Sequence, residues 1–167
     1  MTNKKDIRNL NIEELAQFCF IHNLPKFRAK QVWEWLWKKR ATSFKEMTSI
    51  SKKTRELFND HFIINSIKIH NEEISSDGTI KYSFKLHDSL LIEGVLIPSK
   101  KRLTACISSQ VGCSLSCKFC ATGTLKLERN VTASEIYEQV FLLNEQAALI
   151  FGKPISNIVY MGMGEPL

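Results

Sequence analysis

The order of elements in the second half of the chain places the strongest constraint on its fold. An apolar strand is predicted over residues 103–108, a helix over about 133–149, and a second apolar strand over 155–160. Thr132 and Glu135 have the spacing of a capping box, which marks the start of this helix. Strand, helix and strand in this order form a βαβ unit with parallel strands. The loops after the two strands, at residues 113–120 and 162–166, should therefore face one pocket.

The first part of the chain has other periodicities. Apolar residues at helical spacing predict helices over residues 11–23, about 28–40 and 51–62, with Asn11 and Ser51 as N-caps. From residue 63 the period changes to two, which predicts strands over 63–74, 81–86 and 90–97. The fold class is therefore α/β. We expect a helical domain over residues 1–65, a connecting β-hairpin region over 66–100, and the first βαβ unit over 101–167.

Composition narrows the class of protein. The 167 residues carry a net charge of +6, which favours contact with nucleic-acid phosphates without requiring it. No apolar run is long enough to span a membrane, and the first six residues precede no apolar signal segment. Five cysteines, three of them clustered, indicate a reducing compartment rather than a disulfide framework. A cytoplasmic protein without membrane contact is expected.

The cluster of cysteines is the strongest chemical signal. Cys113, Cys117 and Cys120 have C-x3-C-x2-C spacing, and iron–sulfur clusters are held by closely spaced thiolates, usually four of them. Three ligands would leave one iron of a 4Fe-4S cluster open to bind another molecule. A structural zinc site stays possible, because zinc takes four ligands and Cys106 could supply the fourth. The four histidines all lie upstream, at positions without zinc-like spacing to the cysteines.

A glycine-rich segment follows the second predicted strand. Gly162 and Gly164 alternate with methionines before Glu165 and Pro166. Glycines allow a backbone to approach a ligand closely, and the Glu165 carboxylate can accept a hydrogen bond from an ammonium or hydroxyl group. A glycine-rich turn without a ligand is the alternative interpretation.

Together these motifs resemble the radical S-adenosylmethionine enzymes. The segments 106–113, 117–123, 129–132 and 161–167 are similar to those of the RlmN family, the adenine-C2 methyltransferases of 23S rRNA and tRNA. Residues 24–37, with Trp33, Trp35 and Trp37, resemble that family's accessory helical domain, which implies that residues 1–65 form an RNA-binding accessory domain. The resemblance implies that residues 101–167 begin a radical-SAM (β/α) barrel that is truncated here.

The resemblance also implies the role of each candidate residue. Cys113, Cys117 and Cys120 would hold the 4Fe-4S cluster, and Gly164 and Glu165 would bind S-adenosyl-L-methionine. The chain's other two candidates would be catalytic: Glu93 would accept a proton, and Cys106 would form a disulfide with the methyl-carrying cysteine during product release. From the residues alone, Cys106 could equally be a small buried strand residue and Glu93 an outward-facing carboxylate.

The expected partners are 23S rRNA, tRNA and an external electron donor of the flavodoxin or ferredoxin type, and a monomer is expected. The methyl-carrying cysteine and most of the barrel should lie beyond Leu167, so this chain alone is expected to lack activity. The alternatives are an adenine-C8 methyltransferase of the Cfr type, a zinc-stabilised RNA-binding module without catalysis, and a degenerate remnant.

Overall fold

The computed structural model describes residues 4–115 and 117–166. The chain divides into two compact units, with the boundary between residues 65 and 66. We call them the N-terminal and the C-terminal unit. In the described part of the chain, no helix is both long and apolar enough to cross a membrane.

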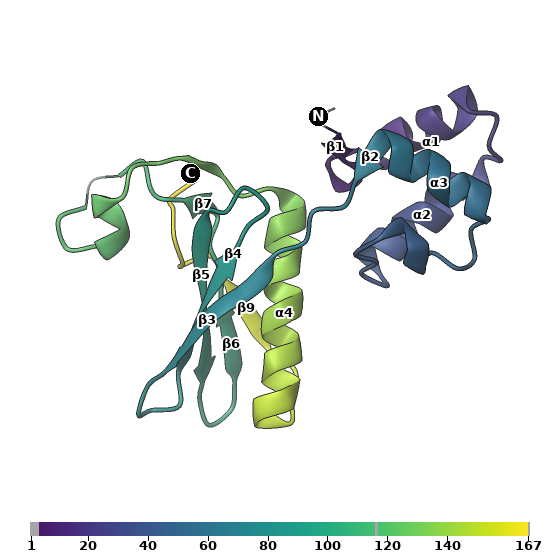
Figure 1. Cartoon of the computed structure of the whole chain (residues 1–167). Helices are drawn as coiled ribbons and strands as arrows, with labels where there is room; N and C mark the ends of the chain where they lie inside the picture. The colour runs from purple at the N-terminus through teal and green to yellow at the C-terminus, as the bar shows by residue number, and fades with distance from the viewer. Residues whose placement is uncertain (1–3, 116, 167) are drawn as a thin grey trace. The chain divides into compact units, whose positions relative to one another are not determined.

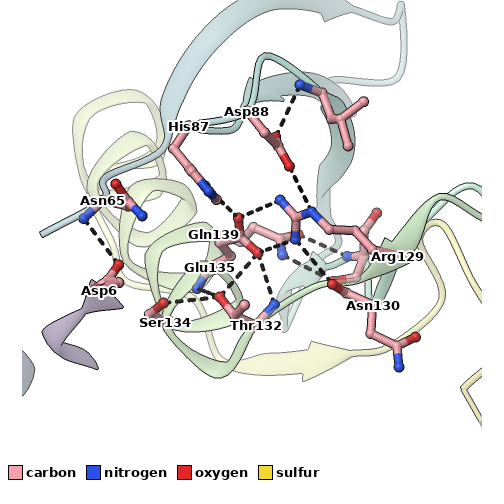
Figure 2. Close-up of polar contacts among 12 residues, drawn as sticks. Asp6, Asn65, His87, Asp88, Arg129, Asn130, Thr132, Ser134, Glu135 and Gln139 are labelled. Carbon is pink, nitrogen blue, oxygen red and sulfur yellow. Dashed lines mark hydrogen bonds and ion pairs between the residues drawn. The ribbon is translucent and has the colours of Figure 1, made fainter. Parts of the chain in front are cut away.

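The N-terminal unit is predominantly helical. Its elements are β1 (Lys5–Asp6), α1 (Ile12–Ile21), α2 (Phe27–Trp37), α3 (Lys52–His61) and β2 (Phe62–Ile63), with short 3-10 turns at Ile7–Asn9 and Phe44–Glu46. β1 and β2 form a parallel pair that brings the two ends of the unit together. Near this pair, the buried Asp6 carboxylate accepts a hydrogen bond of 3.1 Å from the Asn65 backbone (Figure 2).

The helix caps of this unit agree with the sequence pattern. Asn11 and Glu14 form a capping box at the start of α1, and the Ser51 hydroxyl accepts from Thr54 N–H at the start of α3. Helix α2 ends at Trp37 rather than at residue 40, because the chain turns sharply and Arg40 adopts a positive φ of 52°. The core contains the apolar faces of all three helices; Cys19, Val32 and Phe58 are fully buried in it.

The C-terminal unit is an α/β arrangement built on a five-stranded sheet. Its strands are β3 (Lys68–Ile74), β4 (Ile80–Lys85), β5 (Leu91–Pro98), β6 (Leu103–Cys106) and β9 (Asn157–Val159), in the order β3-β4-β5-β6-β9. A short antiparallel pair, β7 (Gln110–Val111) and β8 (Arg129–Asn130), lies outside this sheet. The strands predicted within residues 66–100 therefore share one sheet with β6.

The predicted βαβ unit is confirmed. β6 and β9 are parallel neighbours, and α4 (Ala133–Phe151) connects them. The Thr132–Glu135 capping box begins α4, and Gly152, at a φ of 65°, ends it. Figure 1 shows α4 lying along one face of the sheet, where Leu143 and Ala147 are buried against strand residues such as Phe84 and Leu96.

The opposite face of this sheet carries charged side chains. Side chains alternate between the faces of a strand, so Glu93 points away from the face that holds its buried neighbours Ile92 and Gly94. Lys81 on β4 lies 3.1 Å from Glu73 on β3 and 3.4 Å from Glu93 on β5. The sheet thus has one face packed against α4 and one face with an acid–base–acid row.

Candidate functional site

The three clustered cysteines lie on a loop that is closed at its base by two short strands. β7 and β8 pair antiparallel, with Gln110 opposite Asn130 and Val111 opposite Arg129. We call residues 112–128, between these strands, the cysteine loop. Within it Cys120 N–H donates to the Cys117 carbonyl at 3.1 Å, and Gly123 N–H donates to the Cys120 carbonyl at 3.0 Å. All three thiols are partly exposed and free.

Backbone N–H groups donate hydrogen bonds to two of the three sulfur atoms. Leu115 N–H donates to Cys113 Sγ at 3.4 Å. Hydrogen bonds from the backbone N–H groups of Gly123 and Thr122 lower the pKa of the Cys120 thiol. A lowered thiol pKa favours the thiolate, which is the form that binds metal ions and clusters.

The donor set fits an iron–sulfur cluster in its chemistry, although it is not assembled around one. Among the residues that the structure describes, no three His, Cys, Asp or Glu side chains are gathered closely enough to hold a metal ion. A cavity of about 370 Å³ opens in the cysteine loop beside Cys113, between Gly123 and Leu127. Thiolates supported by N–H donors are the ligands that such clusters use. The assignment of Cys113, Cys117 and Cys120 as ligands therefore stays a prediction.

The glycine-rich segment, residues 161–165, is fastened to the strand that leads into the cysteine loop. The Met163 carbonyl accepts hydrogen bonds from Ser109 N–H at 3.0 Å and from Gln110 N–H at 3.1 Å. Met163 N–H donates to the Ser108 hydroxyl at 2.8 Å, and Glu165 N–H donates to Gln110 Oε1 at 3.0 Å. We call this segment the glycine turn. The two loops predicted to face one pocket are thus joined directly at their bases.

Both glycines of this turn lie too close to neighbouring residues of the chain to carry a side chain. A Cβ atom at Gly162 would lie 2.7 Å from both the Ile107 carbonyl oxygen and the Ser108 hydroxyl. Gly164 has a φ of 100°, and a Cβ there would collide with the Gln110 side chain. Close packing against residues 107–110 therefore requires both glycines, and the contact of Gly164 with a ligand stays a prediction. The Glu165 side chain is exposed, and its carboxylate remains available to a ligand.

Gln139 on helix α4 binds the backbone of Ser108, the residue whose hydroxyl accepts from the glycine turn. The buried Gln139 side chain accepts from Ser108 N–H at 2.9 Å and donates to the Ser108 carbonyl at 3.0 Å. The Ser108 hydroxyl itself donates to the Glu93 carbonyl at 2.6 Å. β6 ends at Cys106 rather than at the predicted residue 108, since Gln139 takes the Ser108 backbone groups that a longer strand would use.

Glu93 and Cys106 lie on the sheet face that α4 does not cover. Cys106 pairs with Val95 across β5 and β6, so Glu93, two residues before Val95, is its diagonal neighbour on that face. Cys106 is buried; burial raises the pKa of its thiol, and a hydrogen bond from the Met161 backbone opposes this effect. Glu93 is half exposed, with its carboxylate beside Lys81. This placement is compatible with the predicted roles and does not test them.

The chain is similar to known proteins along almost its whole length. Residues 5–64 match the family model described as the ribosomal RNA large subunit methyltransferase N-terminal domain. The chain is 56% identical over 164 residues to the "probable dual-specificity RNA methyltransferase RlmN" of Christiangramia forsetii, which covers 98% of this chain and 47% of that protein. The chain belongs to the RlmN family. The "dual-specificity RNA methyltransferase RlmN" of Geobacter sulfurreducens is 45% identical over 97% of this chain and 43% of its own length.

A solved structure supports the same relationship. The crystal structure of a radical SAM methyltransferase from Sphaerobacter thermophilus matches with a TM-score of 0.79 and 36% sequence identity, over 97% of this chain and 48% of that chain. The RlmN-family chain described here thus spans about half the length of the relatives that it matches. The resemblance to the RlmN family and the α/β fold class are confirmed.

In this RlmN-family chain, a network of charged side chains connects β8, at the end of the cysteine loop, to the first turn of α4. Arg129 on β8 donates two hydrogen bonds of 2.8 Å to the Glu135 carboxylate, and its Nε donates to Asp88 at 2.8 Å. His87 Nδ1 lies 3.5 Å from Glu135 Oε1. Figure 2 shows Arg129 between the two carboxylates, with Thr132 beside Glu135. We call His87, Asp88, Arg129 and Glu135 the charged network.

Hydrogen bonds from Arg129 keep the two carboxyl groups of the charged network ionised despite their burial. Burial alone would raise the pKa of Glu135, whose side chain is 4% exposed, but hydrogen bonds from Arg129 and Thr132 outweigh burial and lower it. The same balance of burial against the Arg129 hydrogen bond lowers the pKa of Asp88. The sequence predicted Glu135 only as a capping residue, and Arg129 only as part of a family motif. No local pattern indicates that Asp88, 41 residues earlier, is a partner of Arg129.

Proposed function

We propose that this chain is part of an enzyme that methylates adenine C2 in 23S rRNA and tRNA by radical S-adenosylmethionine chemistry. The observation that carries the proposal is the similarity to RlmN proteins over 98% of the chain, cysteine loop and glycine turn included. The direct hydrogen bonding between the glycine turn and the base of the cysteine loop supports it, because one pocket could then hold both a cluster and its ligand. We further propose that β6, α4 and β9 begin a (β/α) barrel.

The proposed roles divide between the two loops and the open sheet face. Cys113, Cys117 and Cys120 would hold a 4Fe-4S cluster, which when bound supplies the electron that cleaves S-adenosyl-L-methionine. Glu165, exposed on a turn whose backbone is held rigidly, would accept hydrogen bonds from the amino group of that cofactor. Gly164 would contact the cofactor through its backbone. The side on which a Cβ atom would lie is packed against Gln110.

The catalytic proposals use the open sheet face. The raised pKa of Cys106 keeps its thiol protonated near neutral pH, so that it would become a nucleophile only when a base or a substrate approaches. Glu93, a half-exposed carboxylate on the same face, would accept a proton. A methyl-carrying cysteine beyond this chain, an electron donor of the flavodoxin or ferredoxin type, a monomeric state and a cytoplasmic location complete the proposal.

Electron paramagnetic resonance on the anaerobically reconstituted and reduced chain tests the proposal. We expect a cluster signal that changes when S-adenosyl-L-methionine is added, because an open iron would bind its amino and carboxylate groups. 5′-Methylthioadenosine, which lacks both groups, should leave the signal unchanged. Stoichiometric zinc in place of iron would favour the zinc-stabilised module, and the absence of any bound metal would contradict the assignment of the site to these residues.

Gln110 is proposed as a positioning residue of this site. Its buried carboxamide accepts from Glu165 N–H and donates to Asn130 Oδ1 at 2.9 Å, so it links the glycine turn to both strands of the cysteine loop. Replacing it by alanine should speed hydrogen exchange in residues 161–165 by about tenfold, because the turn loses an anchor. In the cluster-loaded chain, the Kd for S-adenosyl-L-methionine should rise by about tenfold with iron content unchanged.

Two further variants separate positioning from general loss of stability. Gln110→Glu keeps an acceptor for Glu165 N–H and should restore slow exchange in the turn. Gln146→Ala, a half-buried glutamine on α4, should change neither exchange in the turn nor cofactor affinity. If Gln110→Ala behaved like Gln146→Ala in both measurements, the positioning role would be wrong.

A further inference from the structure

A basic pocket in the N-terminal unit lies entirely outside the cysteine loop and the glycine turn. It has a volume of about 620 Å³ and is formed by the start of α3, the 3-10 turn before it and the end of the unit. Its walls contain Thr42, Ser43, Phe44, Lys45, Lys52, Arg55, Glu56, Asn59, Ile63 and Ile64. We refer to these residues as the basic pocket.

The charges of the basic pocket are mostly uncompensated. Its lining holds three cationic side chains, Lys45, Lys52 and Arg55, against one carboxylate, Glu56, so its net charge is +2. The ion pair between Lys52 and Glu56 is long, at 3.9 Å, and both side chains are well exposed, so its attraction is weak. Among the described residues, no carboxylate forms an ion pair with Lys45 or Arg55. An anionic ligand would therefore meet little competition.

Hydrogen bonds hold the walls of the basic pocket in place. Arg55 on α3 donates through Nη1 to the Lys45 carbonyl, so the guanidinium is already immobilised at the junction of two walls. The Thr42 and Ser43 hydroxyls each donate to Glu46 at 2.8 Å, which orders this wall of the pocket. Preordered groups lose little conformational entropy when a ligand binds.

Apolar surface completes the pocket beside these cations. Ile63 is 44% exposed, and it lies with Ile64 and Phe44 in the lining. A ligand that matches both surfaces has an anionic group joined to a flat apolar ring. Nucleotides have this structure, since the base offers an apolar face and the phosphate offers the charge.

We propose that the basic pocket binds one phosphorylated nucleoside of a single-stranded RNA segment. The base would lie against Ile63 and Ile64, and the phosphate between Lys45, Lys52 and Arg55. The choice of RNA as the source rests on the proposed function, whereas the chemistry of the ligand rests on the pocket alone. This site would add a contact with the RNA that is separate from the site of methyl transfer.

Paired charge variants test the site in the full chain. The double variant Lys45→Ala/Lys52→Ala removes two exposed lysines from the pocket, and the control Lys30→Ala/Lys53→Ala removes two exposed lysines that do not line it. A six-nucleotide single-stranded RNA should bind the pocket variant about tenfold more weakly, with a salt slope about 0.7 smaller, because the contact with one phosphate is lost. The control should lose less than about threefold.

Nuclear magnetic resonance with single nucleotides locates the ligand. Adenosine 5′-monophosphate should shift the resonances of Asn59 and Ile63, whereas adenosine and inorganic phosphate should each shift them less at equal concentration. Equal weakening by both double variants would show diffuse attraction and overturn the proposal, as would unshifted pocket resonances. Iron content and the response of the cluster signal to S-adenosyl-L-methionine belong to the other unit, so a failure of the proposed function would be seen separately.

Discussion

Replacing Glu135 by alanine is expected to lower the free energy of unfolding of the C-terminal unit by about 3 kcal/mol. The variant leaves Arg129, which is only 26% exposed, without its two-bond partner, and it removes the acceptor of Thr132 N–H at the start of α4. Asp88 still pairs with Arg129, which keeps the loss at the lower end of the range for buried ion pairs. Glu128→Ala, an exposed glutamate in the same segment, should cost less than about 0.5 kcal/mol.

The stability of the N-terminal unit provides an internal control for this measurement. All three tryptophans lie in the N-terminal unit, at positions 33, 35 and 37. Tryptophan fluorescence during urea unfolding should therefore report that unit, and Glu135→Ala should leave its midpoint unchanged. Hydrogen exchange or pulse proteolysis of peptides from residues 66–166 then reports the C-terminal unit. Equal effects of Glu135→Ala and Glu128→Ala there would show that the charged network contributes nothing to stability.

The charge of Glu135 also predicts a pH dependence. Because folding lowers the pKa of this carboxyl, its contribution is fully present above the pKa of the unfolded chain and is lost as the pH falls through the folded value. The unfolding free energies of the native chain and Glu135→Gln should therefore differ by about 1–2 kcal/mol at pH 7 and begin to converge as the pH falls below about 4.3, the pKa of a glutamate in an unfolded chain. A difference that stays constant down to acidic pH would mean that the charge is not the stabilising property.

Local patterns in this sequence predicted local structure well. The Asn11 N-cap, the Thr132 capping box and the parallel pairing of β6 with β9 each follow from spacings within a few residues or from one connection rule. These features depend on backbone periodicity and helix termini, which neighbouring residues determine. The α/β fold class was therefore predictable.

The contacts that shape the site could not be predicted in this way. Gln110 meets Glu165 across 55 residues, and Gln139 meets Ser108 across 31. A glutamine has no sequence signature for the backbone groups that it will bind, because its partners are brought close only by the completed sheet. The glycine turn shows the same limit: the sequence left open whether its glycines serve a ligand or a plain turn, and it gave no sign that they pack against residues 107–110.

The clustered cysteines carry the other large expected effect. Replacing Cys113, Cys117 or Cys120 singly by alanine should reduce the iron content of the reconstituted chain from about four atoms to below about one, because two thiolates rarely retain a 4Fe-4S cluster. Inductively coupled plasma mass spectrometry measures iron and zinc together on each variant, and visible absorption reports the cluster. Full iron content in any one of the three variants would refute that residue as a ligand.

Cys106→Ala distinguishes the cluster from the zinc alternative. Under the cluster assignment Cys106 is no ligand, so iron content should match that of the native chain. In a four-thiolate zinc site Cys106 would be the fourth ligand, and its removal should release the metal. The structure favours the first outcome: Cys106 is buried at the end of β6 with a raised pKa, whereas Cys120 lies on a partly exposed loop where N–H donors lower the pKa of its thiol. A metal ligand must be a thiolate; the surroundings of Cys120 favour that form, whereas burial of Cys106 opposes it.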